Sequence, residues 1–505
     1  MRFMGPQWWT RRELLKRGAA VAAAARLRNL QAQADAKPDL ASDPRRPQFH
    51  LLPAANWMND PNGPIYWKGQ YHMFFQYNPN GAYWGDMHWA HAVSSDMVHW
   101  RHLPVALSPT PGGPDQDGCF SGSAVVNSGA PTFIYTGVAS VPKEQATLSD
   151  GQHNFRETQC IATCNLPELT AWKKDPAPVI ATPPAGLEIT GFRDPCPWRL
   201  GDWWYLCVGS GLRGKGGMIL LYRSRDFRHW EYLHPLVEGT MPAGKQPNAV
   251  DPVASGEMWE CPDFFAIRDK YLLIYSTQGK VFWQSGALDS ESMRFHAGQS
   301  GLLDHGSFYA PKTQLDKDGN RILWGWIPET RPLEEYRASG WAGLMSLPRM
   351  LDLDSQGRLT MRVLTGIEGL RGSEQSGAVK VIRDCCGDVQ CRAALSKEPF
   401  TLSLSLQEGK ELLGVEWRPE TNKLLLDGEE YPAIDVSQKA IDVNAYIDGS
   451  VIELFVNGSF ARTKRFYYPG SEAPVIRVVA AGGAAELKVW QIRPISTDRL
   501  SGKSV

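Results

Sequence analysis

The segment Trp57-Met58-Asn59-Asp60-Pro61-Asn62-Gly63 places a carboxylate between an amide and a proline, after a tryptophan and before a hydrophobic run. Proline disfavours the α conformation of the residue before it, and Asn-Gly is a typical tight-turn dipeptide. We therefore expect Asp60 to lie at the end of an extended segment that a turn holds in place. The same seven residues also fit an ordinary surface hairpin, so their meaning depends on the rest of the chain.

The chain after this segment has the pattern of an all-β protein. From about residue 51 to 345, short alternating or apolar runs end at turn residues, and no long helical period interrupts them. Five pairs of runs are predicted to form hairpins: 64–70 with 71–77, 122–127 with 132–138, 195–200 with 203–209, 263–268 with 271–277, and 312–315 with 321–327.

A second repeat supports a ring of similar units. Segments 94–100, 168–172 and 224–230 resemble one another and each ends in tryptophan, and 292–295 is a weaker fourth copy. Repeats at this spacing favour a five-bladed β-propeller over the alternative, a large β-sandwich. From about residue 371 to 497, short alternating strands with Asp-Gly and Asn-Gly turns predict a C-terminal β-sandwich.

The remaining segments complete the domain prediction. Arg11-Arg12, followed by an Ala-rich stretch, predicts a twin-arginine export signal over 1–34, so we expect a periplasmic or extracellular protein. No stretch of about 20 apolar residues follows, and we expect no membrane span. The predicted boundaries are a linker at 35–47, the propeller at 48–350, a connector at 351–370, the sandwich at 371–497 and a tail at 498–505.

The composition indicates which classes of binding partner are not expected. The 53 Lys and Arg balance 54 Asp and Glu in a chain of 505 residues, which does not favour nucleic acid as a partner. The nine cysteines are odd in number and include no Cys-x-x-Cys pair, so we expect buried thiols and no zinc site. We expect a monomer, and the sequence leaves an oligomer open.

Three acidic motifs occur where predicted blades begin: Asn59-Asp60-Pro61, Phe192-Arg193-Asp194-Pro195 and Trp259-Glu260-Cys261-Pro262-Asp263. A propeller brings such points together at one end of its channel, so we expect three carboxylates in equivalent positions to face one cavity. Such a cavity could also hold Ca²⁺, but the chain has no Asp-x-Asp-x-Asp loop, and we predict no metal.

Hydrolysis of a glycosidic bond needs one ionised and one protonated carboxyl group. Asp60, short and rigidly placed, suits the nucleophile. Glu260 suits the general acid/base, because the apolar neighbours Trp259 and Cys261 would favour its protonated form. Asp194, held ionised by the adjacent Arg193, suits stabilisation of the transition state.

Two further side chains are candidates for substrate contact. Gln76 lies in an apolar run, where an unpaired amide would be costly, so we predict that it binds ligand. Trp84 has polar neighbours, which predict an exposed ring that either stacks on the sugar or packs at the rim of the site.

With these motifs the chain resembles glycoside hydrolase family 32, the β-fructofuranosidases, over residues 48–495. The resemblance also rests on 87–92, 120–123 and 340–343. It implies a five-bladed propeller followed by a β-sandwich, the catalytic roles given above, no cofactor, and retention of configuration with Asp60 and Glu260 about 5 Å apart. It implies a substrate-binding set of Trp57, Asn59, Gln76, Trp84, Phe120, Ser121, Arg193 and Tyr309.

The sequence leaves several readings of the activity open. The leading prediction is an enzyme that releases fructose from sucrose or from inulin-type or levan-type fructans. A fructosyltransferase would use the same covalent intermediate, and a non-catalytic fructan-binding propeller is a third possibility. The presence of all three carboxylates argues against the third, because a pure binder could have lost any of them.

Overall fold

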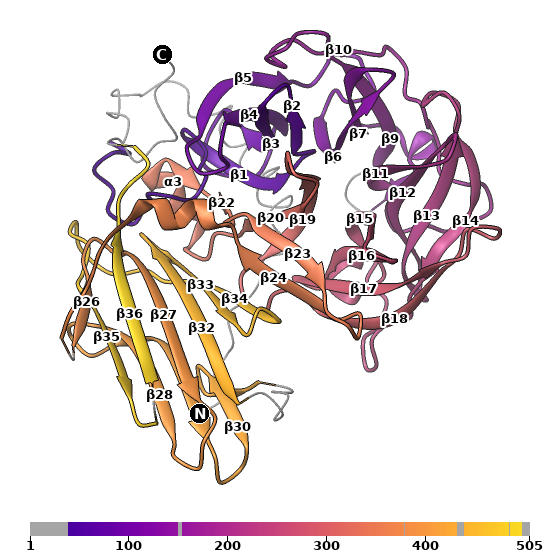
Figure 1. The fold of residues 1–505 in the computed structure, drawn as a ribbon. Coiled ribbons are helices and arrows are strands. Elements are labelled where there is room, and N and C mark those ends of the chain that lie inside the picture. The colour runs from indigo at the N-terminus through magenta and orange to yellow at the C-terminus, as the bar shows by residue number, and fades with distance from the viewer. Residues whose placement is uncertain (1–38, 150–153, 378, 432–438, 484, 497–505) are drawn as a thin grey trace.

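The computed structural model in Figure 1 describes residues 39–149, 154–377, 379–431, 439–483 and 485–496. Five small sheets form a ring, and two further sheets packed against each other lie to one side of it. This arrangement confirms the predicted propeller and C-terminal sandwich. The predicted export signal and the C-terminal tail lie outside the described residues, within which no helix is long and apolar enough to span a membrane.

Each blade of the propeller is built around four antiparallel strands. Blade one contains β1 (Asn56–Pro61), β3 (Gln70–Asn78), β4 (His88–Ser94) and β5 (Arg101–Leu107), with β2 (Ile65–Trp67) beside β3. Blade two contains β6 (Gly118–Asn127), β7 (Ala130–Ser140), β9 (Asn154–Thr163) and β10 (Lys173–Lys174), with β8 (Leu148–Ser149) beside β9 and the 3₁₀ helix η1 (Lys143–Gln145) in the connection.

The other three blades follow in chain order. Blade three contains β11 (Arg193–Leu200), β12 (Trp203–Leu212), β13 (Gly216–Ser224) and β14 (Glu231–Glu238). Blade four contains β15 (Glu260–Ile267), β16 (Lys270–Thr277), β17 (Lys280–Leu288) and β18 (Phe295–Leu302), preceded by the helix α2 (Pro252–Ser255). Blade five contains β19 (Tyr309–Leu315), β20 (Arg321–Ile327), β23 (Arg349–Leu353) and β24 (Leu359–Val363), with β22 (Leu344–Met345) beside β20 and the helix α3 (Leu333–Ser339) in the connection.

The innermost strands β1, β6, β11, β15 and β19 share an irregularity. Each gains one residue relative to its partner strand, which is the geometry of a β-bulge. The bulge residue precedes proline in four blades, and in blades three to five it has a positive φ. The bulge residues, in blade order, are Asp60, Ser121, Asp194, Cys261 and Ala310, and the residues before them are Asn59, Phe120, Arg193, Glu260 and Tyr309.

This register corrects two sequence predictions. The acidic motifs lie within the innermost strands, whereas the sequence predicted them ahead of the first hairpin strands. The three acids are also not equivalent, because Cys261 occupies the bulge position that Asp60 and Asp194 occupy in their own blades. Glu260 precedes the bulge, at the position of Arg193.

The second sequence repeat marks the connection between the third and fourth strands of blades one to four. One residue in each copy adopts a positive φ: Met97, Leu169, Phe227 and Met293. In blades one and three, the serine that begins the segment accepts the N–H of that residue. The repeat is therefore a structural turn, as expected for equivalent parts of similar blades.

A short strand from the fifth blade's connection closes the ring. β21 (Trp341–Ala342) pairs in parallel with β1, which carries Asp60. Gly343 follows at φ 76°, and a Cβ on it would lie 2.0 Å from the carbonyl oxygen of Met58. Glycine is therefore required where the last blade meets the first.

Residues 351–363 were predicted to belong to the connector. They form strands of blade five instead. The helix α3 and its flanking residues separate these strands from β20, so no local hairpin pattern pairs them with it. The connector is the 3₁₀ helix η2 (Thr365–Leu370).

The sandwich packs two six-stranded sheets around one apolar core. One sheet has the order β25 (Arg371–Glu374), β36 (Ala485–Ile492), β27 (Cys386–Ala394), β32 (Ala440–Asp448), β33 (Val451–Val456) and β34 (Phe460–Arg465). The other has the order β26 (Lys380–Ile382), β35 (Ile476–Ala481), β28 (Phe400–Leu406), β29 (Glu411–Arg418), β30 (Lys423–Leu426) and β31 (Glu429–Glu430).

A buried polar network joins the sandwich to the propeller. His50 contacts Asp448 and Glu453 of the sandwich at 2.8 and 2.9 Å. Arg349 of β23 binds Glu453 at 2.6 Å and Asp304 at 2.9 Å. Charges removed from water need such partners, so this network fixes the position of one domain against the other.

Candidate active site

Asp60 is fully buried and is held by a chain of side-chain hydrogen bonds. The Trp57 indole N–H donates to Asn59 at 2.7 Å, and the Asn59 amide donates to Asp60 Oδ1 at 2.9 Å. The Ser121 hydroxyl donates to Asp60 Oδ2 at 2.6 Å. Because both carboxylate oxygens accept hydrogen bonds from fixed donors, the ionised group is stabilised and aimed in one direction.

Asp194 approaches the same place from blade three. Its Oδ2 accepts the backbone N–H of Cys261 at 2.9 Å, and its own N–H donates to Thr136 at 2.9 Å. The Cys261 sulfur lies 3.5 Å from Asp60 Oδ2 and 3.4 Å from Asp194 Oδ2. Blades one, three and four therefore bring two carboxylates to a single thiol.

Glu260 lies between an arginine and a tyrosine. Its Oε1 accepts from Arg193 Nη2 at 2.9 Å, and its Oε2 accepts from the Tyr309 hydroxyl at 2.8 Å. The sequence predicted apolar neighbours for Glu260 and a pairing of Arg193 with the adjacent Asp194. That view of Glu260 is wrong, because the guanidinium reaches across from blade three to the acid of blade four.

Glu157, on β9, binds Arg193, and the sequence did not predict it as a residue of the site. Its Oε1 accepts from Arg193 Nη1 at 3.0 Å, and its Oε2 accepts the Phe192 N–H at 2.6 Å. Burial raises the pKa of the Glu157 carboxyl, while the Arg193 guanidinium and the Phe192 N–H oppose this effect. The only signal in the sequence was an acidic residue inside an otherwise strand-like run.

Of the other predicted residues, some face the site and others only pack around it. Gln76 donates to the carbonyl of Cys119 at 2.8 Å, so its amide positions the strand that carries Ser121. The predicted exposure of Trp84 is wrong: the side chain is 7% exposed, and its ring meets the edge of Phe120 at 5.8 Å. Tyr309 and Trp57 face a cavity of about 880 Å³ together with Glu260.

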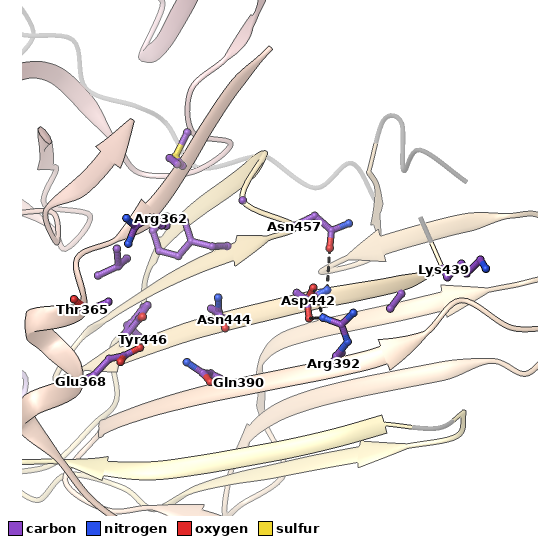
Figure 2. Close-up of a pocket in the computed structure, with 15 residues that line it drawn as sticks. Arg362, Thr365, Glu368, Gln390, Arg392, Lys439, Asp442, Asn444, Tyr446 and Asn457 are labelled. Carbon is purple, nitrogen blue, oxygen red and sulfur yellow. Dashed lines mark hydrogen bonds and ion pairs between the residues drawn. The ribbon is translucent and has the colours of Figure 1, made fainter. Parts of the chain in front are cut away.

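A second hollow, of about 640 Å³, lies where the sandwich meets β24 of blade five and the connector η2, and it contains none of the predicted site residues (Figure 2). Gln390 and Asn444 face it from neighbouring strands, and the Arg392–Asp442 ion pair lies farther along the same strands. Within the part of the chain that the structure describes, no group of three or more His, Cys, Asp or Glu side chains could hold a metal ion.

Comparison with known proteins agrees with this architecture. Residues 50–362 match the glycosyl hydrolases family 32 N-terminal domain, and residues 370–493 match the C-terminal domain of the same family. The sucrose-6-phosphate hydrolase of Escherichia coli is 36% identical over 490 residues, which cover 88% of this chain and 94% of that protein.

Two solved structures share the fold over most of both chains. The β-fructofuranosidase of Bombyx mori matches with a TM-score of 0.75 at 28% identity, covering 96% of this chain and 99% of that one. The fructan 1-exohydrolase IIa of Cichorium intybus, solved with 1-kestose, matches with a TM-score of 0.71 at 27% identity, covering 89% of this chain and 98% of that one. On these matches and this site, the chain belongs to glycoside hydrolase family 32.

Proposed function

We propose that this glycosidase releases fructose from β-fructofuranosides through a covalent intermediate on Asp60. The observation that carries the proposal is the convergence of three buried carboxylates, two on the sulfur of Cys261 and the third held by Arg193 and Tyr309. Such a set supplies a nucleophile, a proton donor and a stabilising charge.

In the first step, an Asp60 oxygen attacks the anomeric carbon of the fructosyl unit while Glu260 gives its proton to the leaving oxygen. Asp194 stabilises the positive charge that develops on the ring. In the second step, Glu260 takes a proton from water, which displaces Asp60. Fructose leaves, and the net reaction adds one water across the bond with configuration retained.

The hydrogen bonds around each acid suit these roles. Asp60 has donors on both oxygens that restrict its motion. Glu260 has a tyrosine and an arginine that stabilise the anion formed once its proton has gone. The Ser121 and Asn59 donors also fix the attacking oxygen before substrate arrives, which lowers the entropic part of the barrier.

Fructose release tests the proposal. Wild type and Asp60→Asn are incubated with sucrose, inulin and levan, and free fructose is measured enzymatically. We expect release by the wild type and a loss of several orders of magnitude in the variant, with unchanged circular dichroism. A folded wild type that binds these sugars but releases no fructose from any of them would overturn the proposal.

We also propose export through the twin-arginine route, on the basis of Arg11-Arg12 and the Ala-rich stretch after them. A reporter fused to residues 1–34 should reach the periplasm of a bacterial host, and replacing both arginines by lysine should retain it in the cytoplasm. Equal export of both fusions would contradict this route.

A further inference from the structure

A second row of hydrogen-bonding side chains lies two positions after the bulge residue on each innermost strand. In blades three to five, this is the residue at which regular strand pairing resumes. The members of the second row are all buried, and one of them is a cation: Asn62, Ser123, Cys196, Asp263 and Lys312. The proposed catalytic steps use none of these side chains.

Two members of the second row hold the backbone of a neighbouring blade. The Ser123 hydroxyl donates to the Pro195 carbonyl at 2.8 Å, and the Lys312 ammonium donates to the Pro262 carbonyl at 2.7 Å. Each of these prolines directly follows a bulge residue. The two contacts therefore fix the chain beside the bulges of blades three and four.

Asp263 links the second row across three blades. The Cys196 thiol of blade three donates to its Oδ1 at 3.3 Å, and the Thr313 N–H of blade five donates to its Oδ2 at 2.7 Å. Thr313 follows Lys312 in the chain, so the acid and the cation of the second row are held next to each other.

Lys312 is 2% exposed, which is an unusual environment for an ammonium group. Burying a charge is costly, and a position that needed only packing could hold an apolar side chain of similar volume. Burial alone would lower the pKa of this ammonium, but neighbouring groups raise that pKa above its ordinary value. They are, in order of effect, Cys196, Asp263, Cys261 and Asp194. The charge of Lys312 therefore acts on an acid of the active site.

Two further titratable groups face the second row from neighbouring strands. Burial raises the pKa of the Cys207 thiol on β12, which leaves this group neutral. Arg321 on β20 faces Asp263 and carries a second positive charge. The charge of Arg321 acts on the second row, whereas the charge of Lys312 also acts on Asp194.

The active site gathers four carboxyl groups above this row. Glu260 and Glu157 bind the Arg193 guanidinium. Asp60 accepts from an amide and a hydroxyl, and Asp194 accepts from a backbone N–H, all of which are uncharged donors. Because neighbouring carboxylates disfavour each other's ionised forms, a buried cation behind them opposes this effect.

We propose that Lys312 is a positioning residue for Asp194. Its ammonium holds the Pro262 carbonyl, and with it the bulge at Cys261 whose N–H binds the Asp194 carboxylate. Its positive charge keeps Asp194 ionised among the other acids of the site. The inference rests on the proposed function, in which Asp194 must be an anion to stabilise the positive charge that develops on the fructosyl ring.

The pH dependence of kcat/KM for sucrose tests this role. The acid limb of the profile reports the carboxylates that must be ionised in the free enzyme. We would compare wild type with Lys312→Met, Asp263→Asn and Arg321→Met, and check by urea unfolding that each variant folds. Arg321→Met is the matched control, because it removes a neighbouring cation that faces the same acid of the second row.

We expect Lys312→Met to move the acid limb upward by about one pH unit, so that kcat/KM at acidic pH, relative to its plateau, falls about tenfold. Asp263→Asn removes a negative charge from the second row and should move the limb downward. This opposite shift keeps the inference testable if Lys312→Met does not fold. The control should leave the limb in place.

A purely structural role of Lys312 would lower the stability or the plateau and leave the acid limb unmoved, and that result would overturn the inference. An equal upward shift in Arg321→Met, or a limb that Asp263→Asn does not lower, would also overturn it. If wild type releases no fructose, the proposed function itself fails. An active wild type with an unshifted limb in folded Lys312→Met contradicts only the role of Lys312.

Discussion

The charge on His50, at the interface between the two domains, should make the stability of the protein depend on pH. Its ring is fully buried between Asp448 and Glu453. Burial alone would lower the pKa of this histidine, but the two carboxylates outweigh it and raise the pKa from 6.5 to about 9. A group with a raised pKa in the folded state stabilises that state fully below its unfolded pKa. The stabilisation is lost as the pH rises through the folded pKa.

The size of the effect follows from the shift. Each pKa unit corresponds to about 1.4 kcal/mol, so moving the pKa from 6.5 to about 9 is worth roughly 3 kcal/mol. Replacing His50 by glutamine removes the titrating group. The difference in the free energy of unfolding between wild type and His50→Gln should therefore be largest at pH 6 and shrink by roughly 3 kcal/mol by pH 10.

Urea unfolding followed by circular dichroism at several pH values measures this difference. Groups that do not contact His50 titrate in both proteins and cancel in the comparison. His229→Gln is the control, because the His229 side chain is 90% exposed beside its own carboxylate, Asp226. Its difference from wild type should stay within about 0.5 kcal/mol at every pH. A constant difference for His50→Gln between pH 6 and 10 would refute the assigned role of the charged imidazole.

Three further substitutions probe the site and its scaffold. Tyr309→Phe removes one hydrogen bond from Glu260, and we expect kcat/KM for sucrose to fall about tenfold; an unchanged value would remove Tyr309 from the acid/base machinery. Glu157→Gln weakens the ion pair that positions Arg193. By analogy with residues that position metal ligands, we expect kcat/KM for sucrose to fall about 10–100-fold. Full activity would show that Arg193 does not need Glu157. Gly343→Ala introduces a clash where the ring closes and should cost about 1–3 kcal/mol in urea unfolding, whereas equal stability would contradict the close approach.

Local sequence motifs predicted that Asp60 and Asp194 come together, because each motif contains the β-bulge that positions its carboxylate. A bulge residue followed by proline recurs in blades one, three, four and five, and each copy lies on the innermost strand of its blade. The repeated turn at 94–100 and 224–230 indicated blades for the same reason. These features depend on neighbours in the chain, which a sequence displays directly.

Contacts between blades could not be predicted in this way. Arg193 precedes Asp194 in the chain, yet its guanidinium binds Glu260 and Glu157 on two other blades. Trp84 has polar neighbours in sequence, but Phe120 of the next blade covers its ring. The cation–carboxylate network at the domain interface joins residues about 400 positions apart, and no local pattern pairs them.

In the proposed mechanism, Asp60 forms the covalent bond to fructose. Glu260→Gln, given a fructoside with an activated leaving group, should form the intermediate normally and hydrolyse it slowly, because the general base is missing. Acid quenching and peptide mass spectrometry would then locate the sugar. We predict one fructosyl unit on the peptide that contains Asp60. A fructosyl unit on the peptide that carries Asp194, or none despite turnover, would contradict it.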